Sequence, residues 1–392
     1  MTTKTDSIWT RGFALLCFAQ LLGYAQHAIL TPTLPLYITH LGGSPLIVGA
    51  VLAAFAATSV VVRPVFGEWV DRWSEAGVMA CGLFFSALSQ VLCFIPLVET
   101  TVISNALRGI GWAGLNTGGY SLLASTAPPS KRGEASGYYS GVQGSATILF
   151  PALALWIIDA RFGGFNAAFG TAIAFAVIGA AAGTGLARYR EPTPKSARVE
   201  RGGPWWREFF GVEDREVFLP ALMLFTLNLS FPAVTSFLVL HAKNIGIQNF
   251  GSYFVIAGAT NLIARPTLGR LSDRIGRHRS LALGFMFQLC ALFLLLFASS
   301  LSALAASGVL YMLGNAIGTS TALALAVERA NPQRRGKAMA TFSVAYPMSY
   351  GAGSLLIGSA VEFVGFPGMF LTAGGISASG LALVALHRSR LK

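Results

Sequence analysis

Long apolar runs fill most of this chain of 392 residues, and they constrain its fold more than any other feature. A helix needs about 20 mainly apolar residues to cross the hydrocarbon core of a bilayer. We therefore expect an all-α membrane protein with twelve transmembrane helices. These lie near residues 10–38, 46–70, 76–96, 101–126, 133–158, 165–187, 218–241, 248–271, 279–299, 301–327, 336–361 and 367–387. Only 11% of the residues are charged, against about a quarter in a soluble protein, which excludes an ordinary soluble enzyme.

The charged residues are distributed unevenly between the predicted loops. Arg161 and Lys243 are the basic residues on one side, whereas 25 of the 28 basic residues lie on or beside the opposite side. Because Lys and Arg are retained in cytoplasmic loops, we expect both termini in the cytoplasm and a bacterial inner membrane as the location. Membrane topology thus accounts for the net charge of +12, and we expect no nucleic-acid partner.

The sequence contains an internal duplication. Residues 63–72 match 265–274 at an offset of 202, and Lys131–Gly133 matches Arg334–Gly336 at an offset of 203. Each matched segment holds the same place relative to the predicted helices. The two copies therefore have the same orientation in the membrane.

The duplication predicts three parts of the chain. We expect an N-terminal six-helix bundle at residues 1–187, a cytoplasmic linker at 188–217 and a C-terminal six-helix bundle at 218–392. The linker is the only long polar stretch, and Trp205 and Phe209 within it suggest an interfacial helix. The alternative is a plain linker whose aromatic residues anchor it to the headgroups.

Both copies carry the pattern Gly-x-x-x-Asp-Arg between their second and third helices, beginning at Gly67 and at Gly269. This pattern resembles the signature of the major facilitator superfamily, and the resemblance in fold extends over the whole chain. It implies a conformational latch that closes the cytoplasmic side in one state. The latch residues would be Arg63, Gly67, Asp71, Arg72, Arg265, Gly269, Asp273 and Arg274. The first copy departs from the pattern at Trp73–Glu75, so we expect the second to be the firmer latch; the alternative is that these charges only fix topology.

Shorter matches resemble the twelve-helix drug–proton antiporters and their metabolite-efflux relatives. Leu22–Gly23 with Pro32 and Pro35 is similar to their first-helix pattern. Their fourth helix normally reads Arg-x-x-Gln-Gly-x-Gly, and here Asn105 takes the Arg position and Arg108 the Gln position. The resemblance implies proton-coupled efflux of a small metabolite, toxin or drug by alternating access. An importer or facilitator of a small organic solute is the alternative.

In this fold the substrate cavity lies at the midplane, lined mainly by the first, fourth, seventh and tenth helices. Polar side chains recur there at helical spacing, and they face lipid only at a cost. We expect substrate binding or coupling at Tyr24, His27, Asn105, Arg108, Trp112, Asn116, Gln143, Asn228, Tyr311, Asn315 and Tyr346. The alternative for each is a hydrogen bond between helices.

Arg108 is the one basic residue well inside a predicted helix, where it costs at least about 2.5–3.5 kcal/mol. No carboxylate lies near the middle of any predicted helix, so we expect a neutral or anionic substrate. The alternative is an internal ion pair or backbone contact that supports packing. If the proton gradient is the energy source, His27 or a carboxylate at a helix end must carry the proton.

Other function classes lack their motifs. No HxxH, CxxC, GxSxG or P-loop pattern occurs, which argues against an enzyme. The four cysteines lie in apolar runs and are expected to be small buried hydrophobes. We therefore expect no metal and no cofactor, and a monomer in the lipid bilayer that takes a small molecule as substrate.

Overall fold

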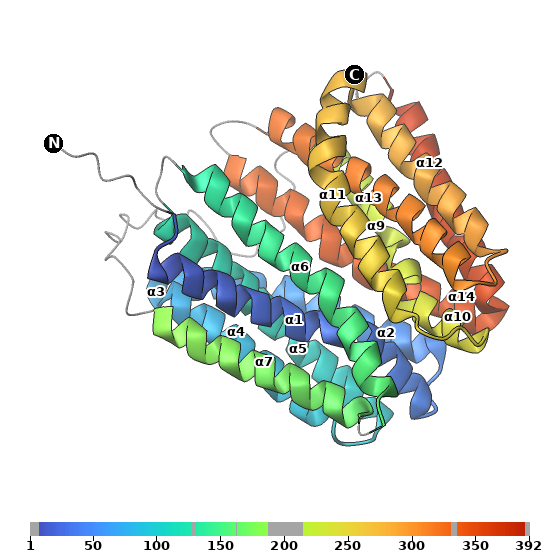
Figure 1. Cartoon of the computed structure of the whole chain (residues 1–392). Helices are drawn as coiled ribbons and strands as arrows, with labels where there is room; N and C mark the ends of the chain where they lie inside the picture. Colours follow the sequence, from blue (N-terminus) through green and yellow to red (C-terminus); the bar gives the residue numbers. More distant parts are fainter. Residues whose placement is uncertain (1–7, 128–130, 162, 187–214, 331–334, 389–392) are drawn as a thin grey trace.

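The computed structural model describes residues 8–127, 131–161, 163–186, 215–330 and 335–388, and every regular element within them is a helix (Figure 1). In these ranges nine helical segments are long and apolar enough to cross a membrane. Two further long helices run beside them, and one of the nine segments is a pair of helices merged across a kink. Together they form the twelve predicted helices, so the expected fold class is confirmed.

The first half contains seven helical elements, because the second predicted helix is divided at Val62 ahead of Pro64. The predicted boundaries are correct to within a few residues. The elements are α1 (Arg11–His40), α2 (Pro45–Val61), α3 (Arg63–Arg72), α4 (Glu75–Leu92), α5 (Val98–Thr126), α6 (Arg132–Asp159) and α7 (Phe165–Gly185).

The second half repeats this order with two irregularities. Its first helix is interrupted by a π-helical turn, and its last two helices are continuous except at Gly365, where φ is 76°. The elements are α9 (Arg215–Leu229), η3 (Ala233–Phe237), α10 (Leu238–Asn244), α11 (Gly251–Ile275), α12 (Arg277–Leu295), α13 (Leu301–Arg329) and α14 (Arg335–Leu386). The predicted interfacial helix in the linker lies outside the described residues.

Glycines at equivalent positions let the third and fourth helices of each half pack closely. A Cβ on Gly82 of α4 would lie 2.6 Å from the carbonyl oxygen of Gly111 in α5. A Cβ on Gly284 of α12 would lie 3.0 Å from the carbonyl oxygen of Gly314 in α13. Small residues at such crossings allow two membrane helices to approach backbone to backbone. The duplication seen in the sequence is therefore also a duplication of packing.

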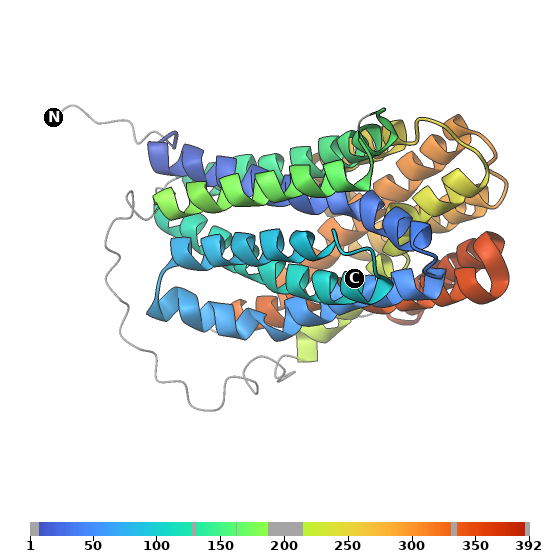
Figure 2. The ribbon, with the colours of Figure 1, turned by 90° about the horizontal axis from the view of Figure 1, so that it is seen from below.

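The two halves pack tightly against each other at one end, here called the closed end, where α1 ends and α2 begins. There α2 packs on α14 and α6 packs on α11. A Cβ on Gly49 would collide with the backbone of Ser354, and the backbone nitrogen of Leu46 donates to Glu362 Oε2 at 3.4 Å. Figure 1 shows α6 and α11 converging towards this end, and Figure 2 shows the same ribbon from below.

The opposite end, where α1 begins and α5 ends, is here called the open end. A Cβ added to Gly137 or Gly141 of α6 would have no atom of another residue within 4 Å. A groove of about 640 Å³ runs here between α1, α6 and α11, lined by Leu21, Val142 and Leu262 among others. The halves therefore diverge from the closed end towards the open end.

Candidate functional site

Arg108 lies in the middle of α5 and is 3% exposed. Its Cζ lies 4.9 Å from the centroid of the Phe55 ring on α2. Its Nε and Nη1 atoms are buried, and no described residue accepts a hydrogen bond from them. A cation over an aromatic face gains about 0.5–2 kcal/mol, less than the several kcal/mol lost when a charge leaves water. The internal ion pair considered from the sequence is absent from the described residues, and two donors stay unused.

One helical turn before Arg108, α5 is fastened to α2 by hydrogen bonds. Asn105 Nδ2 donates to the carbonyl oxygen of Val51 at 2.6 Å, and Thr58 Oγ1 donates to the carbonyl oxygen of Ala106 at 2.8 Å. Asn105 Oδ1 is buried with no partner among the described residues. Asn105 therefore ties two helices together and still has a free acceptor.

The first and fourth transmembrane helices bring an aromatic cluster together. The ring of His27 stacks on that of Trp112, with centroids 4.1 Å apart. The ring of Tyr24 also contacts Trp112, with centroids 4.6 Å apart. Tyr24 Oη donates to Asn116 Oδ1 at 2.8 Å, and Asn116 Nδ2 donates to the carbonyl oxygen of Trp112 at 2.9 Å. His27 Nδ1 has no partner in the part of the chain that is described.

The predicted residues of the second half form a separate network. Asn315 Nδ2 donates to Asn228 Oδ1 at 3.1 Å, and both side chains are buried. Tyr311 Oη is 2.7 Å from Ser230 Oγ. These bonds join α13 to the seventh transmembrane helix, as the alternative of interhelical hydrogen bonding predicts.

The remaining two predicted site residues, Gln143 and Tyr346, make contacts with other side chains. Gln143 on α6 accepts a hydrogen bond from Tyr120 Oη at 3.3 Å, while its Nε2 has no partner among the described residues. Tyr346 on α14 is 43% exposed, and its ring centroid is 6.4 Å from that of Phe231. Tyr346 and Tyr120 are therefore the more accessible polar aromatics near the junction of the halves.

The predicted latch residues are mostly at the surface of the open end. Arg72 pairs with Glu68, one turn earlier on α3, at 2.5 Å, and Asp71 is exposed. Arg63 is half-buried, and Gly67 has no atom within 4 Å of a would-be Cβ. In the second copy Arg265 and Arg274 are exposed, whereas the surroundings of Gly269 and of the Asp273 side chain are outside what the structure describes. The latch stays a prediction.

A contact that the sequence did not suggest ties the third helix to the fourth in each half. Glu75 accepts hydrogen bonds from Ser121 and Ser125 of α5, both at 2.9 Å. Arg277 pairs with Glu328 of α13 at 2.5 Å. Position 75 corresponds to 277 in the duplication, and 125 to 328. The first half therefore has a carboxylate–hydroxyl contact where the second half has an ion pair. Glu75, which departs from the signature pattern, supplies the carboxylate.

A family model described as Major Facilitator Superfamily matches residues 16–298 and 217–392. The chain belongs to the major facilitator superfamily. As a member of this superfamily it is a multi-pass membrane transporter and not an enzyme.

Curated relatives are similar at low identity. The chain is 27% identical to Multidrug resistance protein 1 of Bacillus subtilis over 61% of its own length, and it spans about half (55%) of that relative. It is 24% identical to the multi-drug resistance efflux pump PmrA of Streptococcus pneumoniae, with 73% of this chain and 74% of the relative covered. It is 21% identical to the staphylopine export protein of Staphylococcus aureus, with 92% of each covered.

Solved structures show the same fold. The nucleoside transporter NupG superposes with a TM-score of 0.72 at 15% identity, covering 97% of this chain and 100% of the other. A bacterial homologue of the lysosomal transporter Spinster superposes with a TM-score of 0.73 at 14% identity, covering 99% and 96%. At such identities these structures establish the architecture of this superfamily member.

Proposed function

We propose that this transporter exports a small neutral or anionic metabolite, toxin or drug across a bacterial inner membrane, driven by the proton gradient through alternating access. Support comes from relatives whose names denote multidrug efflux and staphylopine export. The protein would work as a monomer with six-helix bundles at residues 1–187 and 218–392, without a metal or bound cofactor.

The observation that carries the substrate class is that two donor nitrogens of Arg108 have no acceptor among the described residues. A guanidinium forms charge-assisted hydrogen bonds with carboxylate, phosphate or sulfonate groups. Nε and Nη1 of Arg108 are buried, and nothing in the described residues accepts from them. An anionic or strongly electronegative substrate group would supply the missing acceptor. Tyr24, His27, Trp112 and Asn116 would then form the surrounding aromatic and polar wall.

The closed and open ends support alternating access in a defined direction. Of the 28 basic residues, 25 lie on or beside the side that includes the open end, and basic loops remain in the cytoplasm. With both termini cytoplasmic, the structure is open to the cytoplasm and closed to the outside. In this state an exporter takes up its substrate.

Flux in everted membrane vesicles tests the proposal. Vesicles energised by respiration would be offered matched sets of fluorescent or radiolabelled compounds: an aromatic carboxylate, its methyl ester and the corresponding amine. We expect accumulation of the carboxylate or the ester that collapses when a protonophore is added. The amine should accumulate least, because Arg108 would repel it.

Two outcomes would redirect the assignment. Exclusive accumulation of the amine would contradict the substrate class. Uptake by whole cells without accumulation in everted vesicles would identify an importer or facilitator instead.

A further inference from the structure

The seventh transmembrane helix is broken near its middle. Helix α9 ends at Leu229, a turn follows at Ser230, and the chain then forms the π-helical turn η3 before α10. Pro232 explains the break, because proline has no N–H to donate and its ring collides with the carbonyl four residues earlier. Single π-helical turns are rare and occur frequently at functional positions.

Three tyrosines from three other helices hold this broken segment. Tyr253 belongs to α11, Tyr311 to α13 and Tyr350 to α14. Their hydroxyl groups each bond to a different residue of the segment: Tyr311 with Ser230 Oγ (2.7 Å), Tyr253 with the carbonyl oxygen of Val234 (3.0 Å) and Tyr350 with Ser236 Oγ (2.8 Å). Tyr253 and Tyr311 are at most 1% exposed. We call these three residues the tyrosine clamp.

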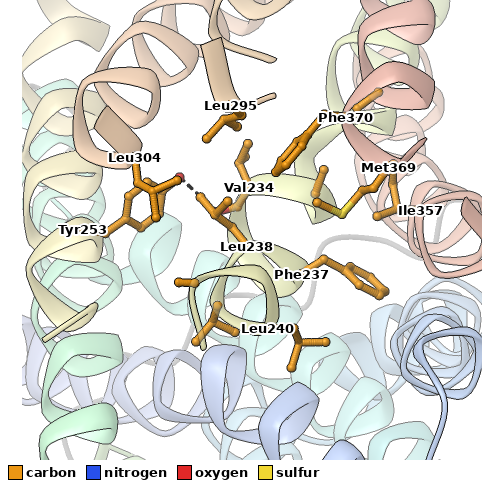
Figure 3. Packing of buried hydrophobic residues seen from close by; sticks show 14 of the residues in the cluster. Val234, Phe237, Leu238, Leu240, Tyr253, Leu295, Leu304, Ile357, Met369 and Phe370 are labelled. Carbon is orange, nitrogen blue, oxygen red and sulfur yellow. Dashed lines mark hydrogen bonds between the residues drawn. The ribbon is translucent and has the colours of Figure 1, made fainter. Parts of the chain in front are cut away.

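The clamped segment runs from the middle of the seventh transmembrane helix towards the closed end, and it lies between the core of the second half and the first half. Figure 3 shows Val234 and Leu238 surrounded by buried side chains of other helices, with the Tyr253 bond to Val234 as a dashed line. On the other side, η3 and α10 contact α1. Any movement that opens the closed end must therefore move η3 and α10 away from α1.

We propose that residues 230–237 form the hinge by which α10 moves when the closed end opens, and that Tyr253, Tyr311 and Tyr350 are positioning residues that hold the hinge in its closed position. A kinked segment with a π-helical turn has fewer regular backbone bonds to break than a straight helix. The side-chain hydroxyls then supply the bonds that fix its geometry. The inference rests on the alternating-access part of the proposed function.

Tyr350 also connects the hinge with the first half of the protein. Its side chain is close enough to Arg108 for the two to interact electrostatically. The same hydroxyl bonds to Ser236 of the hinge. A substrate anion bound at Arg108 would therefore act on the group that fixes the hinge.

Distances across the closed end test the clamp directly. Spin labels would be attached at His40→Cys, at the end of α1, and at Lys243→Cys, at the end of α10, with the four native cysteines replaced by alanine. Both labelled positions are exposed. Tyr253→Phe, Tyr311→Phe and Tyr350→Phe each remove one hydroxyl. We expect each variant to raise the ratio of long to short distances roughly 2- to 10-fold, as the loss of one hydrogen bond allows.

Tyr37→Phe is the matched control. Tyr37 Oη donates to the carbonyl oxygen of Cys93 at 2.8 Å, and its side chain is 5% exposed in the first half. Its loss removes a buried bond of the same kind without touching the hinge. We expect a lower unfolding temperature and an unchanged distance distribution.

Ser236→Ala provides a second test from the other side of one bond. It should shift the distances as Tyr350→Phe does, and the two substitutions together should add little. The inference is overturned if the clamp variants keep the wild-type distribution, or if Tyr37→Phe shifts it equally. The distance measurement needs no substrate, so it can be made whatever the flux experiment shows. A negative result for the clamp variants would likewise not contradict the proposed substrate class.

Discussion

Replacing Arg108 by methionine separates a substrate-binding cation from a packing residue. Methionine keeps most of the side-chain length and removes the charge. Replacing a whole buried ion pair by apolar residues of similar volume is often neutral or stabilising by about 1–4 kcal/mol, and in the described residues Arg108 has no ionic partner that its replacement would leave behind. The contact with Phe55 (4.9 Å) is lost, which subtracts about 0.5–2 kcal/mol. The net change should lie between about 2 kcal/mol against the folded protein and about 3.5 kcal/mol in its favour.

A packing role predicts a larger loss of stability. Removing one member of a buried, satisfied ion pair destabilises a protein by about 3–5 kcal/mol. Thermal unfolding of purified Arg108→Met in detergent therefore distinguishes the two roles. Flux in everted vesicles should meanwhile be nearly abolished in Arg108→Met and Arg108→Ala, and impaired in Arg108→Lys, because an ammonium group lacks the planar fork.

Arg277→Met is the matched control for this prediction. Arg277 is paired with Glu328, whose side chain is 51% exposed, so the loss should be at most about 1 kcal/mol. Transport should persist. A strongly destabilised Arg108→Met protein with wild-type transport per folded molecule would refute the reasoning.

Three further predictions concern topology, the latch and coupling. Reporter fusions after residue 43 and after residue 200 should report outside and inside respectively, and equal sidedness would contradict the topology. Asp273→Asn should slow transport several-fold with normal abundance in the membrane, if the second signature is a latch; unchanged flux would exclude that role. His27→Ala should alter the pH profile of transport if His27 carries the coupled proton. An unaltered profile would place proton coupling elsewhere.

Much of the architecture is readable from the sequence because bilayer thickness dictates helix length. The first aromatic cluster was also predictable, since Tyr24 and His27 share one helix face and Trp112 and Asn116 share another. These residues do meet, through the Tyr24–Asn116 bond and the His27–Trp112 stack. Helical spacing placed each pair on one face of its own helix, and the expectation that the first and fourth helices line one cavity brought the two faces together.

Contacts between segments were not predictable in the same way. Nothing in the spacing of α2 indicates that Phe55 covers Arg108, because that contact depends on how α2 and α5 cross. The clamp bonds of Tyr253 and Tyr350 likewise depend on tertiary packing. Pro232, flanked by Ser230 and Ser236, was nevertheless a usable signal for a broken helix with its own hydrogen-bonding groups.

The equivalent ties at Glu75 and Arg277 have a consequence for how the two halves diverged. A carboxylate stands on the third helix of the first half, whereas in the second half it stands on the fourth, at Glu328. Changing Arg277 alone to glutamate would set two carboxylates against each other, and changing Glu75 alone to arginine would leave only hydroxyls to face it. Single steps between the two chemistries are thus unfavourable in both directions. Each contact therefore depends on both of its members, so the two halves are not interchangeable at this position although their helices pack alike.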